Sequence, residues 1–166
     1  MTGGHTVAAF DAEMKRLHGT VERMGRLAEE QLAWALRAMA AGDAELAGAV
    51  MRRDGEIDRL EAEVESLAIR LLALRQPMAR DLREIVAAFK VASNIERIGD
   101  FAASVAKRAV TLSGLPVAAP VQSLLPMGET VLAMVRDVVA AYADQDADRA
   151  LDVRNRDARV DHAYTA

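Results

Sequence analysis

Residues 50–77, VMRRDGEIDRLEAEVESLAIRLLALRQP, contain the pattern that decides the fold. Apolar residues recur here every seven positions, with leucines interleaved between them: Val50, Ile57, Val64 and Leu71. This alternating three–four spacing is typical of a helix that packs one face against neighbouring helices. We predict that the helix begins after Gly42-Asp43, where the aspartate can cap it, and ends at Gln76-Pro77.

The rest of the chain shows further helical segments and nothing typical of a strand. Helices are predicted at about 5–40, 78–113 and 123–143, and from 146 to the end of the sequence. Gly114, Pro116 and Pro120 mark a linker, and Pro126 is expected in the first turn of the fourth helix, where proline is tolerated. Long helices with short connections favour an all-α fold of antiparallel three-helix bundles in tandem.

Composition and charge narrow the class of protein. Cysteine is absent, which excludes disulfides and thiolate metal sites. The apolar runs are too short to span a bilayer, and no secretion signal opens the chain. The formal net charge is −4, whereas a nucleic-acid binder needs a basic face. We therefore expect a cytoplasmic protein that neither binds nucleic acid nor inserts into a membrane.

A shift of 103 positions aligns the two ends of the chain without a gap. Met24-Gly25 falls on Met127-Gly128, and Arg53-Asp54-x-x-Ile57-Asp58 falls on Arg156-Asp157-x-x-Val160-Asp161. We interpret this match as a duplication. The counterpart of the third helix would lie beyond residue 166. The expected organisation is a first bundle over 1–114 and the first two helices of a truncated second bundle over 121–166, with an apolar face left uncovered.

Three pairs of acidic residues are each spaced by one helical turn: Asp54/Asp58, Glu96/Asp100 and Asp157/Asp161. Like charges at this spacing disfavour a helix, so the pairs call for an explanation. Asp58 lies 19 residues before Pro77 and Glu96 lies 19 residues after it. In an antiparallel hairpin the first two pairs therefore reach the same height, and four carboxylates converge.

A cluster of oxygen ligands without cysteine suits a hard metal ion such as iron, manganese, magnesium or calcium. The alternative is a solvated acidic face, partly neutralised by Arg53, Arg59 and Arg97. A di-iron enzyme of the ferritin type is less favoured, because the sequence has no Glu-x-x-His pair. The three histidines are interpreted as surface residues: His5, His18 and His162. The alternative for His162, which follows Asp161, is a role as a metal ligand.

Two stretches resemble the PhoU family of phosphate-uptake regulators. They are LALRQPMARDLR at residues 72–83 and NIERIGDFA at residues 94–102. The opening HTVAAFD at 5–11 is similar to the start of many members, and Asp157-Ala-Arg-Val-Asp161 resembles the family's second acidic motif. The resemblance covers nearly the whole chain and includes residues outside the predicted core.

The resemblance implies two similar three-helix bundles with acidic motifs that bind surface metal ions. On this sequence those motifs match the residues that the spacing selects: Asp54, Asp58, Glu96, Asp100, Asp157 and Asp161. It also implies a non-enzymatic repressor of the phosphate-starvation response that bridges a phosphate ABC transporter ATPase and a sensor histidine kinase at the inner membrane face. A homodimer is expected. The alternatives are a structural helical interaction module without metal and a metal-storage carboxylate bundle.

The sequence departs from the family pattern at two places. Asn94 stands where members often carry an acid. A second Glu-Arg-Ile-Gly-Asp motif, expected one repeat length after Glu96, would lie beyond residue 166. Asp157 and Asp161 are therefore expected to form only half of a site.

Arginines surround the predicted turn at Pro77. Arg75, Arg80 and Arg83 could bind an anionic partner or phosphate. The favoured alternative is local: Arg75 complements the end of its helix, and the other two pair with Asp81 and Glu84.

Overall fold

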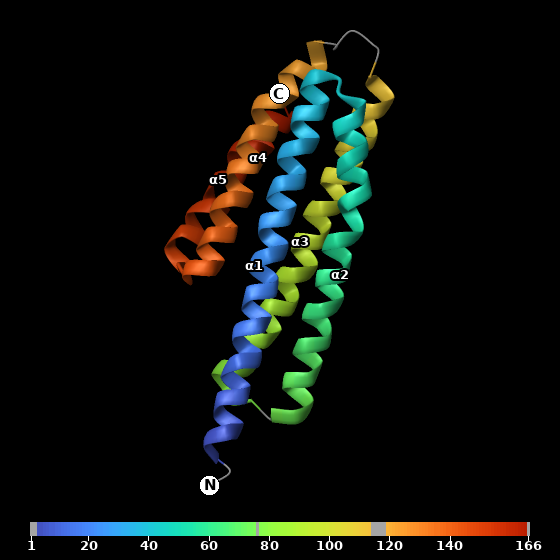
Figure 1. Ribbon diagram of the computed structural model, residues 1–166. Helices are drawn as coiled ribbons and strands as arrows, with labels where there is room; N and C mark the ends of the chain where they lie inside the picture. The colour runs from blue at the N-terminus through green and yellow to red at the C-terminus, as the bar shows by residue number, and fades with distance from the viewer. Residues whose placement is uncertain (1–2, 76, 114–118, 166) are drawn as a thin grey trace.

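The structure is a computed structural model that describes residues 3–75, 77–113 and 119–165. Figure 1 shows long helices packed side by side as antiparallel hairpins. The described residues contain no strand. The all-α prediction is therefore confirmed. The helices are α1 (Gly3–Ala41), α2 (Ala44–Arg75), α3 (Ala79–Leu112), α4 (Ala119–Asp144) and α5 (Ala147–Thr165).

The start of α4 differs from the prediction. The helix begins at Ala119 rather than near Ser123, so Pro126 lies inside it and not in its first turn. Pro120 lies in the first turn instead. Backbone N–H groups in a first turn have no intrahelical partner, so the missing N–H of proline costs no hydrogen bond there. Pro126 is exposed, as is Gln122, whose carbonyl the missing N–H would have met. Water can satisfy that carbonyl, which explains why the helix tolerates the proline.

The turns after α1 and α4 have the same geometry at the repeat offset of 103 residues. Gly42 has a φ of 65° and Gln145 has a φ of 54°. Asp43 caps α2 by accepting a hydrogen bond from the Leu46 amide at 2.9 Å, and Asp146 caps α5 through the Arg149 amide at 2.9 Å. The turn is thus duplicated even where a glutamine stands in place of the glycine that normally favours this backbone conformation.

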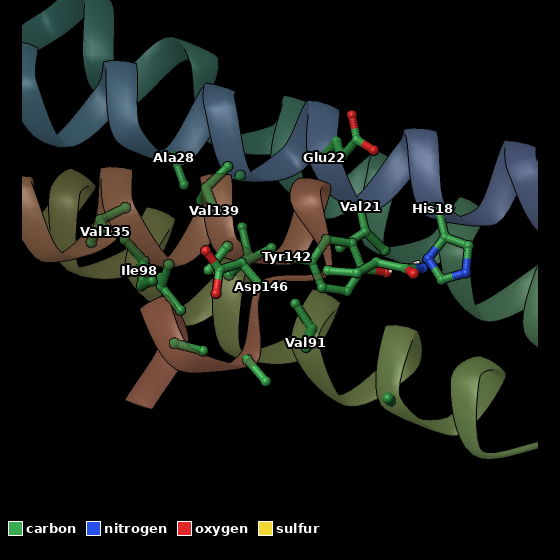
Figure 2. Close-up of a pocket in the computed structure, with 18 of the residues that line it drawn as sticks. His18, Val21, Glu22, Ala28, Val91, Ile98, Val135, Val139, Tyr142 and Asp146 are labelled. Carbon is green, nitrogen blue, oxygen red and sulfur yellow. Dashed lines mark hydrogen bonds between the residues drawn. The ribbon is translucent and has the colours of Figure 1, made fainter. Parts of the chain in front are cut away.

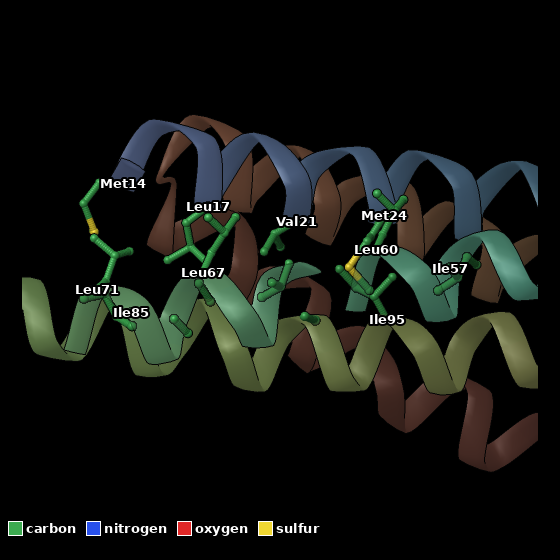
Figure 3. Close-up of a cluster of buried hydrophobic side chains, with 14 of the residues drawn as sticks. Met14, Leu17, Val21, Met24, Ile57, Leu60, Leu67, Leu71, Ile85 and Ile95 are labelled. Carbon is green, nitrogen blue, oxygen red and sulfur yellow. The ribbon is translucent and has the colours of Figure 1, made fainter. Parts of the chain in front are cut away.

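The main core lies among α1, α2 and α3 and is drawn in Figure 3. The side chains that repeat every seven residues in α2 are all at most 1% exposed: Val50, Ile57, Val64 and Leu71. The last three meet α1 through residues such as Leu17 and Met24, and α3 through Ile85 and Ile95, whereas Val50 belongs to a second buried cluster. The predicted seam is the buried face.

Two glycines bring α1 and α4 into close contact. A Cβ added at Gly25 would lie 2.7 Å from Val139 Cγ2, and one added at Gly128 would lie 2.5 Å from Leu36 Cδ2. Gly25 and Gly128 are equivalent in the repeat, and so are Leu36 and Val139. In each unit, the glycine thus leaves room for a side chain of the other unit, and the two contacts are equivalent in the repeat. This close packing gives the glycine of each matched Met-Gly dipeptide a structural role.

An open apolar groove of about 390 Å³ lies among α1 and α3 of the first unit and α4 and α5 of the second (Figure 2). In the first unit, Ala35, Ala38 and Ala47 share a buried cluster with the end of α3. Their repeat equivalents in the second unit line the groove instead: Val138, Ala141 and Ala150. The groove thus lies where the sequence predicts an uncovered apolar face.

Candidate functional site: an acidic groove between α2 and α3

Four carboxylates from α2 and α3 lie close enough to influence one another's protonation. Burial raises the pKa of Asp54, and the charges of Asp58 and Asp100 raise it further. Burial also raises the pKa of Glu96, followed by the charges of Asp100, Glu61 and Asp58. The two acidic pairs therefore reach the same height of the hairpin, as their equal distances from Pro77 indicate.

The close approach of the two helices at this height depends on Gly99. A Cβ added there would lie 2.7 Å from Cδ1 of Ile57, a core residue that is 1% exposed. Gly99 stands between Glu96 and Asp100, and Ile57 stands between Asp54 and Asp58. The apolar contact between the helices thus lies directly beneath the four acids, and the glycine lets their backbones come together.

A polar hollow of about 360 Å³ opens beside the acidic residues. Asp54 and Asp100 line it, together with Ser104 and Lys107 of the neighbouring surface. Asp54 and Glu96 are half-buried, whereas Asp58 and Asp100 are exposed. A hydrated cation can therefore reach the carboxylates from solvent.

Two of the three arginines considered as neutralising partners, Arg53 and Arg59, make other contacts. Arg53 pairs with Glu30 at 3.1 Å, contacts Glu56 at 3.7 Å and covers the ring of Trp34 at 4.7 Å. Arg59 donates a hydrogen bond to the carbonyl of Gly55 at 3.0 Å. In the described part of the chain, no ion pair joins an arginine to any of the four carboxylates. Their repulsion is therefore not offset by these side chains.

The donor set of the groove fits a hard cation in its chemistry, since all four groups are carboxylates. Over the described residues, however, no three acidic or histidine side chains are gathered closely enough to hold an ion. A bound ion would therefore require rotation of at least some of these side chains, which their partial exposure permits. Burial and the repulsion among the acids also favour the protonated forms of Asp54 and Glu96, whose pKa values are raised.

The third acidic pair does not join the other two. Asp157 and Asp161 lie at exposed positions of α5, which packs on α4 and, within the described parts of the chain, does not contact α2 or α3. The structure thus places one group of four carboxylates on the first unit and a separate pair on the second.

His18, interpreted from the sequence as a surface residue, is half-buried. Its side chain is 26% exposed and lies at the wall of the apolar groove, with Nδ1 2.8 Å from Oη of Tyr142 on α4 (Figure 2). Its Nε2 lies 3.9 Å from a carboxylate oxygen of Glu84 on α3. His18 thus links three helices. Its side-chain partner Tyr142 is 124 residues away, so no local pattern could reveal the contact. The side chains of His5 and His162 lie outside the described residues.

Taken together, these features define an all-helical protein built from a duplicated helical-hairpin unit, with an acidic groove on its first unit. The family model described as the PhoU domain matches residues 21–109 and 124–166. These segments make up most of the chain, which therefore belongs to the PhoU family. The two matches begin 103 residues apart, which is the offset of the repeat.

Relatives and solved structures agree with this assignment. The chain is 44% identical over 163 residues to a phosphate-specific transport system accessory protein PhoU homolog of Caulobacter vibrioides, covering 98% of this chain and 71% of the relative. A homolog of the same name from Zymomonas mobilis is 42% identical, with coverage of 97% and 68%.

The crystal structure of PhoU from Pseudomonas aeruginosa superposes with a TM-score of 0.91 at 36% identity, covering 94% of this chain and 75% of that one. The phosphate transport system regulatory protein PhoU from Streptococcus pneumoniae gives 0.86 at 31% identity, with coverage of 94% and 73%. The family consists of accessory and regulatory proteins, so the prediction of a non-enzymatic protein is confirmed. None of the helices in the described ranges is long and apolar enough to cross a bilayer.

Proposed function

We propose that this chain is a negative regulator of phosphate uptake and phosphate-starvation signalling, acting as a metal-binding adaptor. Membership of the PhoU family supports the regulatory part, and the names of its relatives connect it to phosphate-specific transport. The observation that carries the metal-binding part is the group of four carboxylates from α2 and α3, which lie together without an arginine partner.

The metal is a hard ion: iron, manganese, magnesium or calcium. Asp54, Asp58, Glu96 and Asp100 would hold it through oxygen atoms, and the charge of the ion would offset the repulsion among them. Asp157 and Asp161 on α5 provide two further ligands, which need acidic groups from another source to complete a site. Binding would join α2 and α3 at the level of Gly99 and change the charge of the surface.

The partners are a phosphate ABC transporter ATPase and a sensor histidine kinase, which the adaptor would bridge as a homodimer at the cytoplasmic face of the membrane. Its relatives carry the name of accessory proteins of the phosphate-specific transport system. Metal binding would neutralise the negative charge of the groove. The surface that partners meet would therefore differ between the metal-free and the metal-bound protein.

Metal binding is tested by thermal unfolding after treatment with a chelator and re-addition of each ion. The wild type is expected to gain melting temperature with at least one of the four ions. The Asp58→Asn/Glu96→Gln double variant should lose this gain, whereas Asp157→Asn/Asp161→Asn should keep it. Equal stabilisation of the wild type and the first double variant would show that the ion binds elsewhere.

The regulatory role is tested in cells that lack their own PhoU protein and carry a reporter of phosphate-starvation expression. This chain is expected to repress the reporter when phosphate is abundant. Loss of repression in the Asp58→Asn/Glu96→Gln variant would support a role for the metal. Full repression by this variant would instead favour a structural interaction module whose acids are only solvated.

A further inference from the structure

The end of the α2–α3 hairpin exposes large apolar side chains around its turn. Leu74 is 68% exposed and Met78 is 78% exposed, and Leu72 and Leu82 are also exposed. We call these four residues the hairpin tip. All lie within five residues of Pro77, at the lower end of the bundle in Figure 1. None belongs to the core clusters, so this apolar surface has no role in the packing described above.

The stretch of sequence around the tip has a net positive charge, whereas the molecule as a whole has a net negative charge. Residues 70–83 contain four arginines and a single acidic residue, Asp81, although the whole chain has 25 acidic and 21 basic residues. Arg70, Arg80 and Arg83 are exposed. Arg80 pairs with Glu84 at 3.0 Å, as expected from the sequence, but its side chain remains 81% exposed. Such a surface pair is weak and can give way to another anion.

We propose that the hairpin tip binds the surface of an anionic lipid bilayer. Its leucines and Met78 enter the boundary between headgroups and acyl chains, and the arginines contact lipid phosphates. Five residues of helix rise by roughly 7–8 Å, which matches the depth of about 5–10 Å at which interfacial apolar residues lie. An apolar surface combined with a basic one provides the two signals that stable peripheral binding requires.

The high exposure of Leu74 and Met78 favours a bilayer over a protein partner. These two side chains lie outside the apolar cleft that Leu72 lines together with Val86 and Phe89. Anchors of protein interfaces usually fill pockets, whereas exposed apolar side chains beside a turn can enter the deformable headgroup layer. The absence of a membrane-spanning helix among the described residues agrees with contact at the surface only.

The acidic groove does not oppose this contact. Asp58 and Glu96 lie 19 residues from Pro77, which corresponds to roughly 28 Å along the helices. This distance exceeds the Debye length of about 8–10 Å at physiological salt, so the acids are screened from the lipid charge when the hairpin stands on the membrane. The proposal requires neither the metal nor the adaptor role.

Co-sedimentation of the full chain with lipid vesicles tests the proposal. We expect binding to phosphatidylcholine vesicles that contain roughly a third phosphatidylglycerol, little binding to phosphatidylcholine alone, and weaker binding at high salt. Leu74→Ser/Met78→Ser should abolish sedimentation. Arg80→Gln/Arg83→Gln should weaken it by about fivefold per arginine, since each basic residue near an anionic surface contributes about 1 kcal/mol.

The control is Leu124→Ser/Leu151→Ser, which removes two similarly exposed leucines from α4 and α5 and should bind as the wild type does. Circular dichroism checks that each variant folds. Failure of the wild type to bind anionic vesicles would overturn the proposal and indicate a protein partner for the tip. Equal loss in the tip and control variants would overturn it too, because binding would then be non-specific.

Discussion

At the scale of single residues, the pKa of Glu96 shows how the acidic groove affects the stability of the fold. Its pKa is raised above the ordinary 4.5 by burial and then by the charge of Asp100, with smaller contributions from Glu61 and Asp58. At pH values between the ordinary and the raised pKa, the native state therefore binds more protons than the unfolded chain. Its favourable contribution is present in acid and is lost as the pH rises through the raised pKa, so near neutral pH the ionised groove destabilises the fold.

Replacing Glu96 by glutamine should therefore stabilise the metal-free protein near neutral pH. We expect a gain of a few tenths of a kcal/mol in the free energy of unfolding, the usual size of one like-charge pair on a helix. The gain should shrink as the pH falls toward the ordinary pKa of the side chain. Urea denaturation at several pH values, in the presence of a chelator, measures it.

Glu129→Gln on α4 is the matched control, since Glu129 is exposed and lies outside the groove. It should show no comparable dependence on pH. A loss of stability in Glu96→Gln near neutral pH would show that Glu96 makes a favourable contact that outweighs the repulsion.

At the scale of secondary-structure elements, α5 is the least supported helix, because among the described residues it packs on α4 alone. Asp137 of α4 joins the two helices by accepting hydrogen bonds from Arg149 at 2.9 Å and Arg156 at 2.6 Å. These bonds lower the pKa of Asp137. The carboxylate therefore stabilises the hairpin above the ordinary pKa of 3.8, and this contribution is lost as the pH falls through the lowered value.

Asp137→Asn should loosen α5 and leave the first unit intact, because the neutral amide offers the two arginines weaker hydrogen bonds. Amide hydrogen exchange is expected to become faster across residues 147–158 and to stay unchanged in α2 and α3. Asp144→Asn is the control, since Asp144 is exposed and lies 3.8 Å from Arg149. Equal exchange in both variants would show that apolar contacts hold α5 in place.

At the scale of the whole molecule, the two units depend on different contacts. The first has its buried clusters among α1, α2 and α3, whereas, over the described residues, α4 packs on it through α1 and adds Val135 to one of the clusters. The link is the pair of repeat-related contacts at Gly25 and Gly128, joined by the contact between His18 and Tyr142. Burial, followed by the charges of Glu22 and Glu84, raises the pKa of Tyr142, so its hydroxyl stays protonated over the physiological range.

This arrangement predicts that residues 1–113 fold without the rest of the chain, whereas residues 119–166 do not fold alone. The isolated α4–α5 hairpin has no third helix to cover its apolar face, and short isolated helices are barely stable in water. Circular dichroism during heating should show cooperative unfolding of 1–113, at a lower temperature than the full chain, and little helix in 119–166. Loss of cooperativity in 1–113 would show that the first unit needs α4 in order to fold.

Much of the fold and the acidic groove could be predicted because the deciding features are local. The seven-residue repeat in α2, the capping aspartates and the position of Pro77 depend on neighbours along one helix or one turn. Asp58 and Glu96 could be placed opposite each other because a tight antiparallel hairpin pairs residues equally distant from its turn. The start of α4 could not be placed, since both Pro120 and Pro126 suit a first turn.

The sequence by itself therefore determined the helices, their duplication and the height at which four acids meet, since helical periodicity and turn chemistry act over short separations. Only the tertiary structure decided that Gly99 lies against Ile57, that His18 meets Tyr142, and that Arg53 pairs with Glu30 rather than with the acidic groove. These outcomes depend on which helix faces pack together and on competition among alternative partners. Contacts of this kind join residues far apart in the chain, and no pattern within a single helix encodes them.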